Sequence, residues 1–255
     1  MPLLRFDVLT LFPDFFTCFL NSSIIKKAHD KKIIETNFVN FRRFARDKHK
    51  TVDDIPYGGR EGMVLKPEPV FEAVEDILQK LPFKPPIILM SPKGEKFDFK
   101  KARKLAKEKH LIILCGHYAG FDERVSFLAT EEISIGDYVL TGGELAAMVL
   151  IDSVVRFVPG VLGNLKSSEL DSFENGLLEY PQYTRPAIYR GYEVPKVLLS
   201  GNHKEIARWK RLQALELTFK RRPDLLKVRN LSSEEISYLK KLKEKEIEGR
   251  YSKDD

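Results

Sequence analysis

The chain has 255 residues, 43% of them hydrophobic, which is enough to bury the core of one large domain or of two smaller ones. A formal net charge of +6 favours a polyanionic partner, although many basic proteins bind no nucleic acid. The two cysteines, Cys18 and Cys115, are far apart in sequence, which excludes a disulfide framework and a cysteine metal cluster and is typical of a reducing cytosol.

The first predicted element is an apolar strand over residues 3–11. Arg5 and Asp7 interrupt its apolar run, and neither a basic leader nor a small-residue cleavage site accompanies it, so the segment is predicted to be a strand and not a signal peptide. No apolar stretch approaches the length of a membrane span. We therefore expect a cytoplasmic protein without membrane contact.

Further elements follow in chain order. Residues 13–20 are predicted to form a helix and residues 33–41 a strand that ends in a basic run. A long loop over residues 47–63 is typical of a functional or disordered segment. The spacing of apolar residues then predicts helices over residues 69–79, 99–109 and 144–157.

Three apolar segments end at loops that contain glycine or proline. Ile87–Ser91 is followed by Pro92-Lys93-Gly94, Leu111–Cys115 by Gly116–Gly120, and a short predicted strand, Tyr138–Leu140, by Gly142-Gly143 before the helix that starts at Glu144. Glycine lets a ligand approach the backbone closely, because it has no Cβ. Any α/β domain has such loops, but three so close together favour a ligand site at the carboxyl ends of a parallel sheet.

The composition changes after Pro159 and Gly160. Residues 163–176 are polar and small, which is typical of a linker. Beyond Pro195 the chain is predicted to be helical and basic. A helix is predicted to start near Asn202, and the tail from Ser232 is predicted to be a charged, solvated helix.

Several long motifs occur in order along the chain. They are SPKGE from Ser91, CGHYAGFDERV from Cys115, SIGDYVLTGGE from Ser134 and DSFENGLLEYPQYTRP from Asp171, with VDDIPYGGREGMVLKPEP from Val52 before them. From about Leu4 to Leu226 the chain closely resembles the bacterial tRNA (guanine-N1)-methyltransferases, which belong to the knotted SPOUT superfamily.

The resemblance implies the fold, the reaction and the partners. The fold would be α/β, with a trefoil-knotted domain and its parallel sheet at residues 1–161, a flexible linker at 162–175, and a smaller helical tRNA-binding domain with a charged tail at 176–255. The reaction would move a methyl group from S-adenosylmethionine to N1 of guanine 37 in tRNA, beside the anticodon. The active sites of a homodimer would lie at the subunit interface. The knot rests on the resemblance alone, because knots are rare in proteins.

The resemblance also places the cofactor on the strand-end loops. The residues that match the cofactor site are Ser91, Pro92, Gly116, Tyr118, Ile135, Gly136, Asp137, Tyr138, Val139, Leu140, Gly142 and Gly143. Taken alone, Ile135 and Leu140 would be ordinary core residues, and the motif around them favours a binding role.

Two residues match the catalytic groups of the family. Asp171 matches the general base that takes the proton from guanine N1, although a linker aspartate is more often a helix cap or a solvated charge. Arg156 matches the cation that stabilises charge on guanine O6. A cation at the C-terminus of a helix also stabilises that helix, and Arg156 can have both the catalytic and the stabilising role.

The sequence indicates the RNA-contacting residues and any metal less specifically than the cofactor site. Basic residues that could contact phosphates, or simply form solvated faces, are Arg42, Arg43, Arg46, Lys48, His49, Lys50, Lys204, Arg208 and Lys210. Tyr183 and Tyr189 could stack on bases, whereas Trp209 is predicted to be a core residue. The histidines form no metal cluster with cysteine or carboxylate neighbours, so no metal site is predicted, and magnesium enters only as an accessory that the resemblance implies.

The chain departs from the family pattern at His117-Tyr118-Ala119, where the family usually has Arg-Tyr-Glu. Two alternative functions are a methyltransferase with another RNA target, which the Asp171 motif disfavours, and a non-catalytic RNA-binding protein, which only Ala119 favours. A dinucleotide-dependent oxidoreductase is disfavoured, because no GxGxxG follows a first strand.

Overall fold

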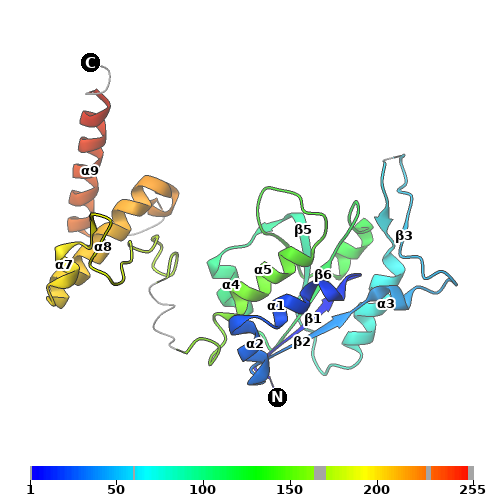
Figure 1. Cartoon of the computed structure of the whole chain (residues 1–255). Coiled ribbons are helices and arrows are strands. Elements are labelled where there is room, and N and C mark those ends of the chain that lie inside the picture. Colours follow the sequence, from blue (N-terminus) through cyan, green and yellow to red (C-terminus); the bar gives the residue numbers. More distant parts are fainter. Residues whose placement is uncertain (1, 60, 164–170, 228–230, 252–255) are drawn as a thin grey trace. The chain divides into compact units, whose positions relative to one another are not determined.

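A computed structural model describes residues 2–59, 61–163, 171–227 and 231–251, with side chains described as far as residue 244. The chain divides into two compact units, Met1–Leu165 and Lys166–Asp255 (Figure 1). The predicted linker, residues 162–175, lies outside the described residues from 164 to 170. In the described part of the chain, no helix combines the length and the apolar character needed to cross a membrane.

The first unit contains a five-stranded sheet in the order β2-β1-β6-β5-β7. All of its neighbouring strands run parallel, which confirms the predicted α/β class with a parallel sheet. The strands are β1 (Leu4–Leu9), β2 (Ile34–Val39), β5 (Ile87–Lys96), β6 (His110–Cys115) and β7 (Glu131–Ser134). A separate two-stranded ladder joins β3 (Asp53–Asp54), inside the predicted long loop, to β4 (Val64–Leu65), which follows that loop directly.

Helices cover both faces of this sheet (Figure 1). One apolar core joins alternate strand residues such as Phe6 and Ile113 to α2, α4 and α5. The other joins the intervening residues, such as Ile112 and Leu114, to α3 and to two short 3₁₀ segments. The helical segments are η1 (Pro13–Phe16), α1 (Thr17–Leu20), α2 (Ser23–Asp30), η2 (Phe41–Phe44), α3 (Pro67–Leu78), α4 (Phe99–Leu105), η3 (Glu123–Leu128) and α5 (Glu144–Val155). Because both faces are covered, the central strands are apolar almost throughout.

Two expectations about the strand ends are wrong in detail. Tyr138–Leu140 is not a strand, and the edge strand of the sheet is Glu131–Ser134. This strand was missed because Ile133 is its only large apolar residue, and its glutamates are partly exposed. Strand β5 also does not end at Ser91 but continues to Lys96 through an irregular stretch. The helix predicted over residues 99–109 ends earlier, at Leu105.

The second unit is built mainly of helices packed on a small core of Leu177, Ala214 and Leu215. Asn202 caps the start of α8 (His203–Arg221) as predicted, because its side chain accepts a hydrogen bond from the Glu205 N–H. Arg208 and Arg211 pair with Glu234 and Glu235 of the last helix. The elements are β8 (Ile188–Tyr189), β9 (Tyr192–Glu193), α7 (Lys196–Leu199), α8 (His203–Arg221), η4 (Pro223–Leu226) and α9 (Ser233–Tyr251).

Candidate active site

A pocket of about 400 Å³ lies at the carboxyl ends of β5, β6 and β7. Its walls come from residues 91–93, in the irregular stretch of β5, and from the segments that follow β6 and β7, residues 116–123 and 135–143. A cavity of this size at the strand ends of an open parallel sheet is typical of a small-molecule site.

The first wall is a bulge in β5. Met90 and Glu95 both pair with Ile133, so residues 91–94 leave the strand ladder between them. At Gly94 the bulge lies against β7, since a Cβ there would stand 2.5 Å from the Glu132 carbonyl carbon. The bulge thereby places Ser91 and Pro92 at the pocket, and the Ser91 hydroxyl accepts a hydrogen bond from the Lys93 N–H at 3.2 Å.

The second wall follows β6. The Gly116 carbonyl accepts a hydrogen bond from the Gly143 N–H at 2.8 Å, which ties this wall to the turn before α5. A Cβ on Gly143 would come within 2.8 Å of the Cys115 Cα, so only glycine permits this approach. Tyr118 has a positive φ of 59° and is about half exposed. Cys115 itself is buried as predicted, and burial, followed by the nearby Glu144 carboxylate, raises the pKa of its thiol.

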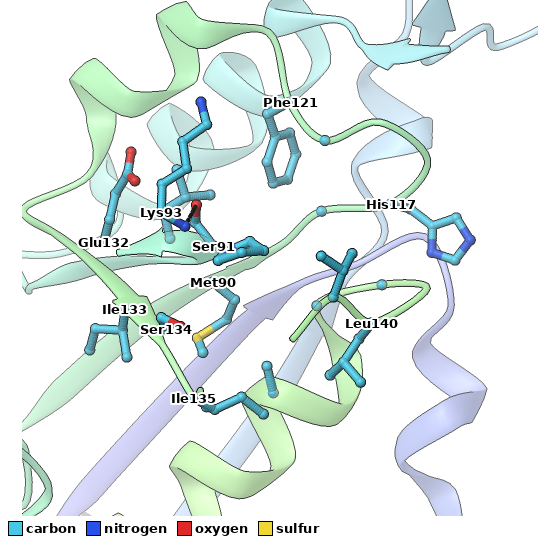
Figure 2. A pocket seen from close by; sticks show the side chains of 18 of the residues that line it. Met90, Ser91, Lys93, His117, Phe121, Glu132, Ile133, Ser134, Ile135 and Leu140 are labelled. Atoms are coloured by element: carbon cyan, nitrogen blue, oxygen red, sulfur yellow. Dashed lines mark hydrogen bonds between the residues drawn. The ribbon is translucent and has the colours of Figure 1, made fainter. Parts of the chain in front are cut away.

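The third wall is the loop between β7 and α5. It turns at Gly136, where φ is +151°, and the Gly136 N–H donates to the Ser134 hydroxyl at 3.2 Å. Figure 2 shows Ile135 and Phe121 at opposite sides of the pocket, with Met90 between them and Leu140 on the side toward His117. Val139 is 82% exposed, so its apolar side chain serves no core in this unit.

Eleven of the twelve predicted cofactor residues line this single pocket. Asp137 does not line it and is exposed on the same loop. Lining residues that the sequence analysis did not assign include Met90, Lys93, Phe121, Glu132, Ile133 and Thr141. Their residue types carry no signal of their own, and Glu132 and Ile133 could not be placed because β7 was not predicted.

The two predicted catalytic residues are not part of this pocket. Arg156 follows α5 as its C-cap and is exposed. The pocket lies at the other end of α5, and a helix of twelve residues is about 18 Å long. Asp171 lies in the second unit, partly exposed at the start of a turn in which its carbonyl accepts from the Glu174 N–H at 3.4 Å.

The accessory magnesium stays a prediction. Among the residues that the structure describes, no group of three or more His, Cys, Asp or Glu side chains could hold a metal ion.

Comparison with known proteins identifies the family. The family model for "tRNA (Guanine-1)-methyltransferase TrmD" matches residues 4–228. Curated relatives called tRNA (guanine-N(1)-)-methyltransferase from Bacillus cereus (strain AH820) and Bacillus anthracis (strain A0248) are each 57% identical over 242 residues, which cover 94% of this chain and 99% of the relative. The chain therefore belongs to the TrmD family of tRNA (guanine-N1)-methyltransferases.

Proposed function

We propose that this tRNA (guanine-N1)-methyltransferase binds S-adenosylmethionine in the pocket at the ends of β5, β6 and β7. The observation that carries the proposal is that residues from three separate motifs, Ser91-Pro92, Gly116–Tyr118 and Ile135–Gly143 apart from Asp137, line one cavity. Apolar side chains such as Ile135 and Leu140 suit the flat adenine ring. The glycine-containing turns leave backbone N–H and C=O groups accessible to its polar edge.

The bound cofactor would supply an electrophilic methyl group, and the chain would supply the proton transfer. Guanine N1 carries a proton at neutral pH and must lose it to accept a methyl group. The Asp171 carboxylate is the proposed acceptor of that proton. The Arg156 guanidinium is the proposed partner of guanine O6, on which negative charge grows as the proton leaves.

We further propose that the working enzyme is a homodimer whose active sites lie between subunits. Within one chain, the length of α5 separates Arg156 from the pocket. A second copy could place its own Arg156 near the pocket. The exposed face of α5 supports this, because Leu145 and Val149 are each 46% exposed and stand at helical spacing with Arg156.

The trefoil knot is also a proposal. After β7 at the sheet edge, the chain returns to the end of β6, where His117 pairs with Gly142 and Gly143 bonds to Gly116. The chain then packs α5 on the sheet face that α4 also covers. This return of the chain to the end of β6 is compatible with the knot that the family implies.

We also propose the domain bounds that the resemblance implies. Residues 1–161 form the cofactor domain, residues 162–175 the flexible linker and residues 176–255 the tRNA-binding domain.

The second unit carries exposed aromatic side chains. Tyr183, Tyr189 and Tyr192 are between half and four-fifths exposed. The Arg190 guanidinium lies 5.4 Å from the Tyr189 ring centroid, so cationic and aromatic groups stand together on the β8–β9 hairpin. Such surfaces suit unpaired bases and phosphates of RNA. Trp209 was predicted to be a core residue, but its side chain is partly exposed and lies beside Tyr183. We therefore add Trp209 to this set.

Calorimetric titration with S-adenosylmethionine tests the pocket assignment. The wild-type chain should bind the cofactor, and Ile135→Asn should lose binding by about tenfold or more, because it places an amide where the adenine ring needs an apolar wall. The matched control, Ile188→Asn on the exposed hairpin, should bind like the wild type. Equal affinity for Ile135→Asn and wild type would refute this position for the cofactor.

A further inference from the structure

The side chains of three residues from separate elements meet beside the proposed cofactor pocket. Glu144 is the first residue of α5, and only 4% of its surface is exposed. Its Oε1 accepts a hydrogen bond from the Thr10 hydroxyl at 2.7 Å. Thr10 follows β1, and its Oγ1 in turn accepts from the Phe12 N–H at 2.9 Å. A buried carboxylate is therefore fixed to the residue that follows β1, an inner strand of the sheet.

The third side chain, His117, belongs to the loop after β6 and faces this carboxylate. Its Nδ1 lies 4.0 Å from Glu144 Oε2. Among the residues that the structure describes, Nδ1 is buried and has no hydrogen-bond partner. The imidazole ring packs against Phe12, with 4.7 Å between ring centroids. Figure 2 shows His117 at the edge of the pocket, beyond Leu140.

Gly142 makes this approach possible. A Cβ at that position would stand 2.3 Å from Glu144 Oε2 and 2.6 Å from His117 Nδ1, so any larger residue would separate the two groups. His117 also pairs with Gly142 through the backbone. The carboxylate and the imidazole thus lie on either side of the turn that opens α5, and both next to the pocket.

Histidine is the side chain that ordinarily changes its charge near neutral pH. A protonated His117 would donate from Nδ1 to the buried Glu144 carboxylate and form a charge-assisted hydrogen bond. Neutral His117 lacks that attraction. The groups packed around the imidazole are Phe12, Tyr118, Gly142 and Glu144, so among the described residues Glu144 is the charged group that faces it, and Tyr118 and the nearby buried Cys115 are the other titratable ones.

We propose that Glu144 is a positioning residue that acts through His117 and holds the loop of Gly116, Tyr118 and Ala119 in its cofactor-binding conformation when His117 is protonated. The inference rests on the proposed cofactor site, since this loop forms its second wall. It also gives a consequence to histidine at position 117, where the family usually has arginine. A permanent cation would keep the pair closed at every pH, whereas histidine makes it depend on pH.

The test is calorimetric titration with S-adenosylmethionine at about pH 6 and about pH 8. Wild type should bind about fivefold more tightly at the lower pH, a coupling of ordinary size between two linked sites. His117→Arg should reduce this difference to that of the cofactor's own ionisation. Glu144→Gln should remove it in the same way and should weaken binding at the lower pH. His203→Arg, on the exposed surface of the second unit, should keep the wild-type difference.

The outcomes separate this inference from the cofactor assignment. Binding by wild type with the same pH dependence as His117→Arg overturns the positioning role and leaves the cofactor site intact. An unchanged pH dependence in Glu144→Gln does the same. Absence of binding by folded wild type at both pH values overturns the cofactor assignment, and the positioning role with it. His117→Arg introduces the residue that the family usually has and is therefore expected to fold. If Glu144→Gln fails to fold, the comparison of wild type with His117→Arg still tests the positioning role.

Discussion

At the scale of single residues, the pocket depends on places where a side chain is absent. At Gly94 and Gly143, a Cβ would stand within 2.5 and 2.8 Å, respectively, of backbone atoms of a neighbouring segment. Backbone cannot move aside as the end of a long side chain can, so any substitution there must shift a wall of the pocket. The sequence predicted that glycines mark the site, but the segment that each one contacts follows only from the fold.

A second feature at this scale is a buried acid inside the sheet. Asp7 of β1 is fully buried and accepts from the Asn37 amide at 2.8 Å, while its other oxygen lies 2.7 Å from His110 Nε2. Burial alone would raise the pKa of Asp7, but hydrogen bonds from His110, Asn37 and Arg5 outweigh it and lower the pKa. The sequence analysis treated Asp7 only as an interruption of an apolar run, because its three partners come from other positions along the chain.

This cluster predicts how stability depends on pH. Since the pKa of Asp7 is lower in the folded state, its stabilisation is present above the unfolded-state pKa and is lost as pH falls through the folded-state value. Asp7→Asn should therefore lower the free energy of unfolding by about 3 kcal/mol at neutral pH, with a gap to wild type that shrinks below about pH 4. Urea unfolding across this pH range measures both effects.

The control for that experiment is Asp30→Asn. Asp30 is exposed and pairs with Lys26, one turn earlier on α2, so its loss should change stability by no more than about 0.5 kcal/mol. A constant gap between Asp7→Asn and wild type down to the most acidic pH would show that the Asp7 charge does not contribute as described.

At the scale of elements, the sequence predicted the strands and helices whose apolar pattern serves a core. The strands at 3–11 and 111–115 and the helix at 69–79 lie close to β1, β6 and α3, because their apolar residues are buried in one or the other core. Where apolar residues serve a pocket, the same reasoning misleads. Tyr138 and Val139 are exposed in a loop that lines the candidate site, and their apolar character was interpreted as a strand.

The edge strand shows the reverse error. In β7, Glu131 bonds to Lys101 at 2.8 Å and to Lys104 at 2.9 Å, so charged side chains attach the strand to α4 where apolar ones would otherwise do so. Hydrogen bonds to Glu131 and then to Glu95 raise the pKa of Lys101. A strand fixed by ion pairs carries too little apolar pattern to be recognised in sequence, and the partner lysines lie about 30 positions away.

At the scale of the whole molecule, the residues proposed for cofactor binding and for catalysis lie in separate parts of the chain. The pocket lies in the first unit, the predicted base Asp171 in the second, and Arg156 stands at the distant end of α5. Hydrophobic periodicity could not reveal a division of this kind, because it reports on local burial and carries no signal for knots or for assembly. The homodimer and the order of the chain through the knot came from resemblance and stay predictions.

Assembly can be tested on α5. Val149→Asp should convert the dimer to a monomer, since it places a charge on the proposed apolar interface, and methyl transfer should fall by about a hundredfold or more. Sedimentation equilibrium should give twice the 29.4 kDa chain mass for wild type and one chain mass for the variant.

The control substitution is Phe127→Asp, which changes an 82% exposed residue of η3, a segment packed on the opposite face of the sheet. Its mass should remain that of the dimer. A wild-type chain that sediments as a monomer while transferring methyl groups at full rate would contradict the shared active site.

The most direct test of the whole account is methyl transfer from labelled S-adenosylmethionine to two unmodified tRNA transcripts that carry guanine or adenine at position 37. Wild type should label only the guanine transcript. Asp171→Asn, which keeps the size of the side chain and removes its basicity, should slow transfer by about 10²-fold or more while cofactor affinity is unchanged. Equal labelling of both transcripts, or an Asp171→Asn chain that transfers at the wild-type rate, would contradict the proposed base and its target.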